Sequence, residues 1–139
     1  MKMARLVLDT NCLLQCISRR SRYHELWCSF LDGRNTMCVT NEILEEYAEV
    51  IERMTDHEFA ELAVDVIINN PYTEFITPYF KFNLIKEDPD DNKFVDCAVA
   101  GNAKFIVSED RHYGVLRTVD FPKVEIIGLD EIMEMLNQN

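Results

Sequence analysis

Glycine and proline are scarce in this chain, which has only four of each among its 139 residues. No glycine-rich stretch has the spacing of a loop that wraps a nucleotide phosphate. Flexible linkers, internal repeats and low-complexity segments are missing too. A chain of this length buries enough apolar surface to be stable by itself, so we expect one domain over residues 1–139.

Cysteine pairs with the spacing of a zinc site are also missing. The five cysteines stand at positions 12, 16, 28, 38 and 97, and none forms a Cys-x-x-Cys pair. An odd number of unpaired thiols is typical of a reducing compartment. The apolar run at the N-terminus is too short for a signal peptide or a membrane span. We therefore expect a cytoplasmic protein without a membrane anchor, with Cys12 and Cys16 one helical turn apart in its core.

Basic residues are few, because 14 Lys and Arg face 25 Asp and Glu and the formal net charge is −11. A protein that grips nucleic acid through a broad basic surface needs many more positive side chains than this. Bound metal ions can supply the positive charge at a nuclease site instead. The acidity therefore argues against a simple nucleic-acid-binding module, but it is compatible with a metal-dependent nuclease.

Short apolar runs alternate with amphipathic segments along the chain. The runs are nearly continuous in hydrophobicity, as expected for strands covered on both faces, and they lie at 5–8, 36–40, 74–77, 104–108 and 123–127. Helical spacing of apolar residues appears at 23–31, 42–54, 59–67 and 129–136, and Gly33 is a plausible stop for the first of these. This order predicts a three-layer α/β/α sandwich around a mainly parallel sheet of about five strands.

Acidic residues follow two of the expected strands. Asp9 comes directly after the first strand, and Asp110 lies just past the strand at 104–108. In a sheet of this kind, ligand sites lie beyond the carboxyl ends of the strands. Asp91 opens a helix and shares its apolar face, an expensive place for a carboxylate without a partner. Asp96 is expected on the opposite, solvent side of the same helix.

A fourth acid is expected from the helix at 42–54, which carries five glutamates. Glu46 borders the apolar stripe of this helix, whereas Glu42 and Glu45 lie further out. Glu52 borders the other edge of the stripe. The helical spacing therefore narrows the choice to two residues without deciding between them.

Carboxylates that converge in one cleft raise each other's pKa unless cations neutralise them. Oxygen ligands suit Mg²⁺ or Mn²⁺, and such ions activate water and stabilise charge on a phosphate. Each acid also has a purely structural interpretation. Asp9 could cap a helix, Asp91 could be a first-turn acid, Asp110 a turn residue and Glu46 a solvated surface residue. The pattern alone therefore supports an acidic metal site only as a hypothesis.

Four segments together resemble the PIN domain family, and within it the toxin components of bacterial toxin–antitoxin operons. They are Leu-Val-Leu-Asp-Thr-Asn (6–11), Val-Thr-Asn-Glu-Ile-Leu-Glu-Glu-Tyr (39–47), Asp-Pro-Asp-Asp-Asn-Lys-Phe-Val-Asp-Cys-Ala (88–98) and Phe-Ile-Val-Ser-Glu-Asp (105–110). The first is common among α/β proteins, but the third followed by the fourth at this distance is specific. The resemblance covers nearly the whole chain.

By this resemblance, the four metal-binding acids of the family match Asp9, Glu46, Asp91 and Asp110. The resemblance implies endonucleolytic cleavage of RNA that depends on Mg²⁺ or Mn²⁺. It also implies a homodimer that is held silent by an antitoxin protein.

Further residues near these acids are predicted to support the site or to serve as alternative ligands. Asn11 and Ser108 match positions that support the site through hydrogen bonds. Asp88 and Asp90 crowd Asp91, and Glu109 precedes Asp110, so these three acids stay open as alternative or additional ligands.

Two other functions fit parts of the sequence. A haloacid-dehalogenase-type phosphatase also begins with an acid after its first strand, but it needs a second acid where this chain has Asn11, and asparagine cannot serve as a general acid or base. That interpretation also gives Glu46 and Asp91 no role. The other alternative is a PIN-like scaffold that binds a partner or RNA without cutting it.

Overall fold

The computed structural model describes residues 4–86, 89–120 and 122–138. Its centre is a sheet of five parallel strands in the order β3-β2-β1-β4-β5. The strands are β1 (Ala4–Leu8), β2 (Asn35–Val39), β3 (Glu74–Phe75), β4 (Phe105–Val107) and β5 (Ile126–Ile127). The expected sheet is therefore confirmed, although β3 and β5 are shorter than the apolar runs that predicted them.

The central strands are buried on both faces. Leu6, Val7 and Leu8 of β1 are fully buried, and all of β2 is buried as well. Neighbouring strands pair in register, with Leu8 of β1 opposite Val107 of β4. Since the carboxyl ends of parallel strands lie at the same edge of the sheet, this register brings the residues after β1 and β4 close together.

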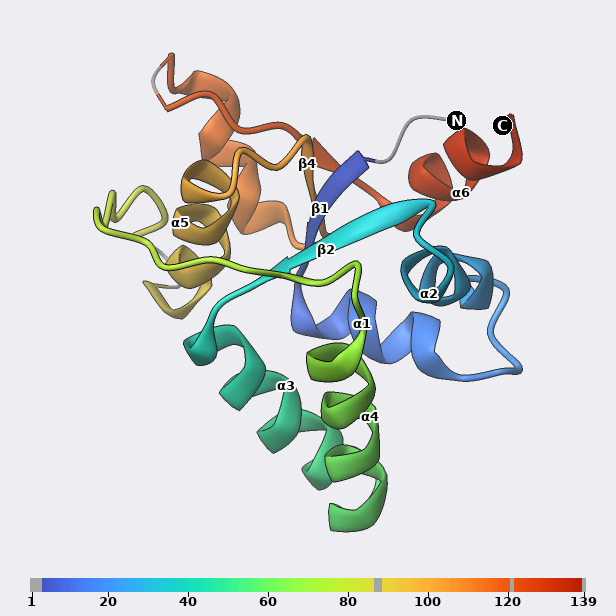
Figure 1. Cartoon of the computed structure of the whole chain (residues 1–139). Coiled ribbons are helices and arrows are strands. Elements are labelled where there is room, and N and C mark those ends of the chain that lie inside the picture. Colours follow the sequence, from blue (N-terminus) through green and yellow to red (C-terminus); the bar gives the residue numbers. More distant parts are fainter. Residues whose placement is uncertain (1–3, 87–88, 121, 139) are drawn as a thin grey trace.

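Helices cover both faces of the sheet, as Figure 1 shows. Helix α5 (Asn92–Ala100) packs against β1, β2 and β4 on one face. Helices α1 (Thr10–Ile17), α2 (His24–Leu31) and α6 (Leu129–Asn137) lie on the other side in Figure 1, where α2 contacts β2 and α6. The three-layer architecture predicted from the sequence is confirmed.

A helical hairpin extends past the sheet. It consists of α3 (Asn41–Met54) and α4 (His57–Asn69), which pack along each other and form the lower end of the molecule in Figure 1. Thr40 and Asp56 cap these two helices with their side-chain oxygens. Gly33 adopts a φ of +84° shortly after α2 ends, so the stop predicted there is confirmed.

Two short 3₁₀ segments flank the last part of the sheet and bear on the site. The first, η1 (Pro89–Asp91), leads directly into α5, and the second, η2 (Arg111–Thr118), follows β4. The sequence pattern did not predict η2. Both segments bring polar residues to the carboxyl end of the sheet.

One expectation about α5 is wrong. Asp96 was expected to face solvent, but it is only 6% exposed and accepts a hydrogen bond from the backbone N–H of Phe82 at 3.1 Å. The chain between β3 and α5 lies against this face of the helix. A helical wheel cannot anticipate such cover, because the covering segment has no regular periodicity of its own.

The five cysteines are free thiols, and all of them except Cys28 are buried. Cys12 and Cys16 both lie in the core, as expected from their spacing. Among the described helices, none is long and apolar enough to cross a membrane.

Candidate metal-binding active site

Asp9 lies at the junction between β1 and α1. One of its carboxylate oxygens accepts a hydrogen bond from the backbone N–H of Cys12 at 2.8 Å, which caps α1. The other oxygen accepts a hydrogen bond from the hydroxyl of Ser108. Asp9 is 7% exposed, and this burial raises its pKa above the ordinary value, with the charge of Asp110 adding to the rise and the two hydrogen bonds opposing it. The capping role and a metal-binding role are compatible, because both use the charged carboxylate.

Ser108 connects Asp9 to Asp110. Its hydroxyl donates to Asp9 and accepts a hydrogen bond from the backbone N–H of Asp110 at 2.9 Å. The side chain of Asp110 in turn accepts from the backbone N–H of His112 at 2.9 Å, at the start of η2. The supporting role predicted for Ser108 therefore has a structural basis, since this residue orients both aspartates.

Asp91 meets Asp110 across the end of the sheet. A carboxylate oxygen of Asp91, one of Asp110 and a ring nitrogen of His112 all lie within 4.8 Å of one another. The three side chains are partly buried, with Asp91 in η1, Asp110 at the cap of η2 and His112 in the first turn of η2. Two segments of the chain, η1 and the start of η2, thus bring potential ligands to one place.

Glu46 reaches the site from α3 and is neutralised by a lysine. One of its oxygens lies 2.5 Å from Nζ of Lys93, and the other accepts a hydrogen bond from the hydroxyl of Thr10. Lys93 also lies 3.0 Å from a carboxylate oxygen of Asp90, and its side chain is 8% exposed. Burial lowers the pKa of Lys93, but its hydrogen bonds to Glu46 and Asp90 outweigh this effect and raise the pKa overall. The amine therefore stays charged among the acids.

Tyr113 lies beneath the acidic residues. It is 1% exposed, and its hydroxyl oxygen is buried without a hydrogen-bond partner among the residues that the structure describes. Burial raises the pKa of this hydroxyl, and the negative charges of all four predicted acids raise it further, so the hydroxyl stays protonated. All four acids therefore act on one buried side chain.

The supporting and alternative residues predicted near these acids differ in their contacts. Asn11 is exposed on α1, whereas the preceding Thr10 is buried and contacts Glu46. Glu109 accepts a hydrogen bond from the backbone N–H of Leu129 at 2.7 Å and so serves the N-terminus of α6. Asp90 pairs with Lys93, and Asp88 lies outside the described residues.

The sequence analysis did not identify Lys93, Thr10 or Tyr113 as residues of the site. Lys93 follows Asp91 by two residues, and a basic residue so close to an acidic cluster was a usable signal. Thr10 directly follows Asp9, but its side-chain direction depends on how α1 leaves the sheet. No pattern in the sequence marks the hydroxyl of Tyr113 as buried beside the acids.

These residues fit a divalent cation of the Mg²⁺ or Mn²⁺ type. The donors are carboxylate oxygens, with one imidazole nitrogen, and such sets suit these hard ions. A positive charge would stabilise the buried carboxylate of Asp9 and could interact with the hydroxyl oxygen of Tyr113, which has no partner in the described part of the chain. Asp91, Asp110 and His112 could hold such an ion, because one ligand atom from each lies within 4.8 Å of the others.

The sequence profile of the PIN domain family matches residues 5–112, which is most of the chain. The chain belongs to the PIN domain family. Membership of this nuclease family supports a hydrolase that acts on nucleic acid. Among functionally curated proteins, none is similar enough in sequence to count as a relative.

Several solved structures share the fold of this PIN domain. VapBC2 from Rickettsia felis, bound to a DNA fragment from its promoter, has 15% sequence identity and a TM-score of 0.62, over 89% of this chain and 98% of its own. VapBC-1 from nontypeable Haemophilus influenzae has 11% identity and a TM-score of 0.63, over 91% and 98%. The PIN domain endonuclease Utp24 has 14% identity and a TM-score of 0.52, over 89% and 84%. At these identities the likeness establishes the fold of the chain.

Proposed function

We propose that this PIN domain is an endoribonuclease that depends on Mg²⁺ or Mn²⁺ and hydrolyses phosphodiester bonds of RNA. The observation that carries the proposal is the convergence of Asp91, Asp110 and His112 within 4.8 Å, beside Asp9 at the end of β1. Family membership supplies the reaction class, because PIN domains are nucleases.

The residues of the site would have different roles in the reaction. Asp9, Glu46, Asp91 and Asp110 would hold one or two divalent ions, which when bound lower the pKa of water and offset charge on the phosphate. Ser108 fixes the carboxylate of Asp9 by a hydrogen bond. Lys93 pairs with Glu46 and Asp90, so its charge would offset part of the acidity that the phosphates of the substrate meet at the site.

A toxin role within a toxin–antitoxin pair is part of the same proposal. The VapBC structures of Rickettsia felis, Haemophilus influenzae and Salmonella typhimurium share the fold, and this likeness supports a cognate antitoxin as partner. The resemblance of the sequence adds a homodimer that acts in the cytoplasm. Sedimentation of the purified chain tests the homodimer, and co-purification with the product of a neighbouring gene tests the antitoxin.

The family match distinguishes the phosphatase from the non-cleaving PIN scaffold. The phosphatase has no support from the family match, which assigns the chain to the PIN domains. A PIN scaffold that binds RNA without cutting it has the same fold and differs only in activity. The experiment below separates it from the nuclease.

The test is cleavage of a labelled single-stranded RNA by the purified protein with Mg²⁺ or Mn²⁺, beside an EDTA control and the variant Asp9→Asn. Asparagine still caps a helix, so the fold should persist while the charge is lost. We expect metal-dependent cleavage that falls at least about a hundredfold in the variant. Full activity of a folded Asp9→Asn protein refutes the site, and absence of cleavage by the wild type favours the non-cleaving scaffold.

A further inference from the structure

Residues 75–86 run from the last residue of β3 toward η1 and contain no helix; we call them the aromatic segment. Figure 1 shows it in yellow-green, running from the middle of the molecule to the outer side of α5. The backbone N–H of Phe82 donates to Asp96, and Ile85 exchanges two hydrogen bonds with the side chain of Asn92, at 2.9 and 2.8 Å. The segment is therefore held against the helix that begins next to Asp91.

Large aromatic side chains on this segment face solvent. Tyr79 is 87% exposed, Phe80 is 74% exposed and Phe75 is 54% exposed. Burying an aromatic ring is strongly favourable, so rings that the fold leaves in water are available to a partner. The ring of Phe80 also lies near that of Phe82, with centroids 6.4 Å apart. The segment therefore carries one ring pair, Phe80 and Phe82, and two further exposed rings, Phe75 and Tyr79.

The charge of the segment is opposite to that of the whole protein. Residues 75–86 contain Lys81 and Lys86 and no acidic residue, although the chain carries 25 acids and a net charge of −11. Both lysines are exposed. An exposed aromatic patch with positive charges suits a polyanion that also presents flat apolar faces, which is the chemistry of unpaired nucleotides.

A hollow beside the segment leads toward the acidic site. It has a volume of about 190 Å³, and its lining includes Ile76, Pro78, Lys81 and Lys93. Lys93 is the residue that contacts Glu46 in the site. A nucleic-acid strand that lies on the segment therefore has a path toward the acidic site, with Lys81 at one end and Lys93 at the other.

Two acids, Glu42 and Asp96, also line this hollow. Asp96 accepts a hydrogen bond from the backbone of Phe82. Glu42 is exposed on α3 and remains as a negative charge beside the hollow. The lining of the hollow therefore has as many lysines as acids, whereas the whole chain has a net charge of −11.

We infer that the aromatic segment is a binding platform for single-stranded RNA, on which Tyr79 and Phe80 stack against unpaired bases while Lys81 contacts the backbone phosphate. This inference rests on the proposed function for the choice of RNA, and it adds the preference for single strands. Stacking on an aromatic ring needs a free face of the base, which a duplex does not offer. The platform would deliver a strand across α5 to the acids.

The test measures binding separately from cleavage. The parent protein is Asp9→Asn with Mg²⁺ present, and fluorescence anisotropy follows a labelled single-stranded RNA and a duplex of the same sequence. Introducing Tyr79→Ala and Phe80→Ala together is expected to raise Kd for the single strand at least about tenfold and to leave Kd for the duplex unchanged. The exchanged pair Tyr79→Phe and Phe80→Tyr keeps both rings and is expected to bind as the parent does.

A matched control is the exposed pair Met54→Ala and Leu62→Ala on the α3–α4 hairpin, which removes apolar surface elsewhere and should leave Kd unchanged. Lys81→Gln is expected to reduce the salt dependence of log Kd by about one unit. Unchanged binding after loss of both rings overturns the platform. So does a switch from dimer to monomer in sedimentation, which would assign the rings to an interface between copies of this chain.

Cleavage assays with proteins that retain Asp9 distinguish the failure of the platform from the failure of the proposed function. If the wild type cleaves RNA and the double alanine variant has the same KM, only the platform fails. A raised KM with an unchanged kcat supports it. If the wild type does not cleave RNA at all, the proposed function fails, and the anisotropy result still decides whether the segment binds single strands.

Discussion

Nζ of Lys93 lies 2.5 Å from a carboxylate oxygen of Glu46, so a protein side chain supplies a positive charge inside the acidic cluster. The contact joins α5 to α3 on the carboxyl side of the sheet. In the metal-free protein this lysine offsets part of the repulsion among the acids, because it also lies 3.0 Å from a carboxylate oxygen of Asp90. A divalent ion would add to this neutralisation, so lysine and metal are expected to act on stability in the same direction.

The first prediction concerns the loss of this lysine. Lys93→Met keeps most of the unbranched side chain but leaves Glu46 without its cation, and we expect a loss of about 2 kcal/mol in the free energy of unfolding. The measurement is urea unfolding in EDTA. Mg²⁺ is expected to restore more stability to the variant than it adds to the wild type. Equal stability of the two proteins in EDTA would show that the ion pair contributes nothing.

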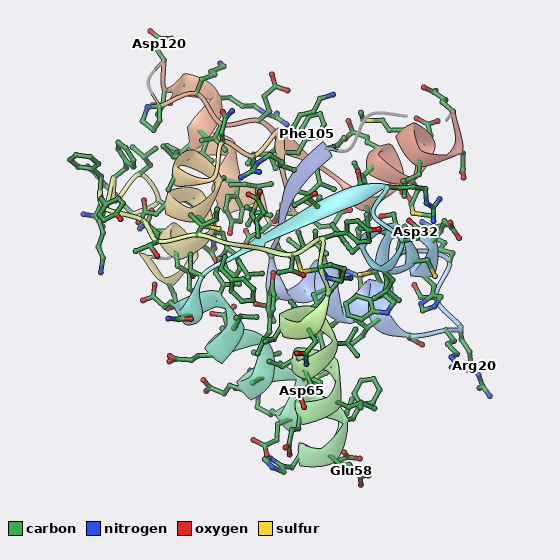
Figure 2. The ribbon with its side chains drawn as sticks, viewed as in Figure 1. Arg20, Asp32, Glu58, Asp65, Phe105 and Asp120 are labelled. Carbon is green, nitrogen blue, oxygen red and sulfur yellow. The ribbon has the colours of Figure 1, made fainter. Side chains whose placement is uncertain are left out.

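The second prediction concerns metal binding itself. At a free Mg²⁺ concentration of about 100 times Kd, a single site that exists only in the folded state adds about 2.7 kcal/mol to the free energy of unfolding. Asp110→Asn removes one charged ligand and is expected to lose most of this gain. Asp120→Asn is the matched control, since Asp120 is exposed and projects from the outer edge of the molecule in Figure 2. A similar gain in both variants would remove Asp110 from the metal site.

The third prediction concerns the buried hydroxyl of Tyr113, which has no partner within the described residues. Tyr113→Phe removes only this oxygen and is expected to raise the free energy of unfolding in EDTA by about 1 kcal/mol. Tyr47→Phe is the contrasting control, because the Tyr47 hydroxyl donates to the backbone oxygen of Leu8 at 2.5 Å. Its loss is expected to cost about 1 kcal/mol. Chemical unfolding of both variants checks the opposite signs, and two losses of equal size would contradict the assignment.

The fourth prediction concerns pH. Burial raises the pKa of Asp96 above the ordinary value of 3.8, opposed by its hydrogen bond from Phe82. The folded state therefore binds a proton more tightly than the unfolded state, and the contribution of Asp96 to stability falls as pH rises from the ordinary value through the raised one. Asp96→Asn keeps an oxygen acceptor and has no charge. Its stability relative to the wild type should rise between about pH 4 and pH 7.

Urea unfolding across this range measures the difference between the two proteins, which removes the titration of the other acids. Asp65→Asn serves as the control, since Asp65 is exposed on α4. A relative stability of the Asp96 variant that is independent of pH would mean that its pKa is the same in the folded and unfolded states.

The sequence predicts the sheet and its covering helices well, because buried strands and amphipathic helices each have a characteristic spacing of apolar residues. The positions of Asp9 and Asp110 follow in the same way, since the residue after a parallel strand must lie at the carboxyl edge. The helical spacing narrows the fourth acid to Glu46 or Glu52 but does not decide between them. The choice of Glu46 came from the family resemblance, and the contact with Lys93 depends on how α3 and α5 approach each other.

What the sequence could not predict lies in the segments without regular periodicity. The aromatic segment covers Asp96, so the solvent side of α5 was assigned wrongly. The 3₁₀ segment η2 positions His112 and Tyr113, and its hydrogen bonds begin from the side chain of Asp110 rather than from a helical pattern. Such segments take their shape from the surfaces on which they lie, and these surfaces exist only once the sheet has formed.

The outermost strands, β3 and β5, are each two residues long. An edge strand offers unpaired backbone groups on which another chain can extend the sheet, and very short edges remove most of that template. Growth of fibrils by strand addition therefore has little to start from at either edge. Partners are therefore expected to recognise this protein through its side chains rather than by adding a strand to its sheet.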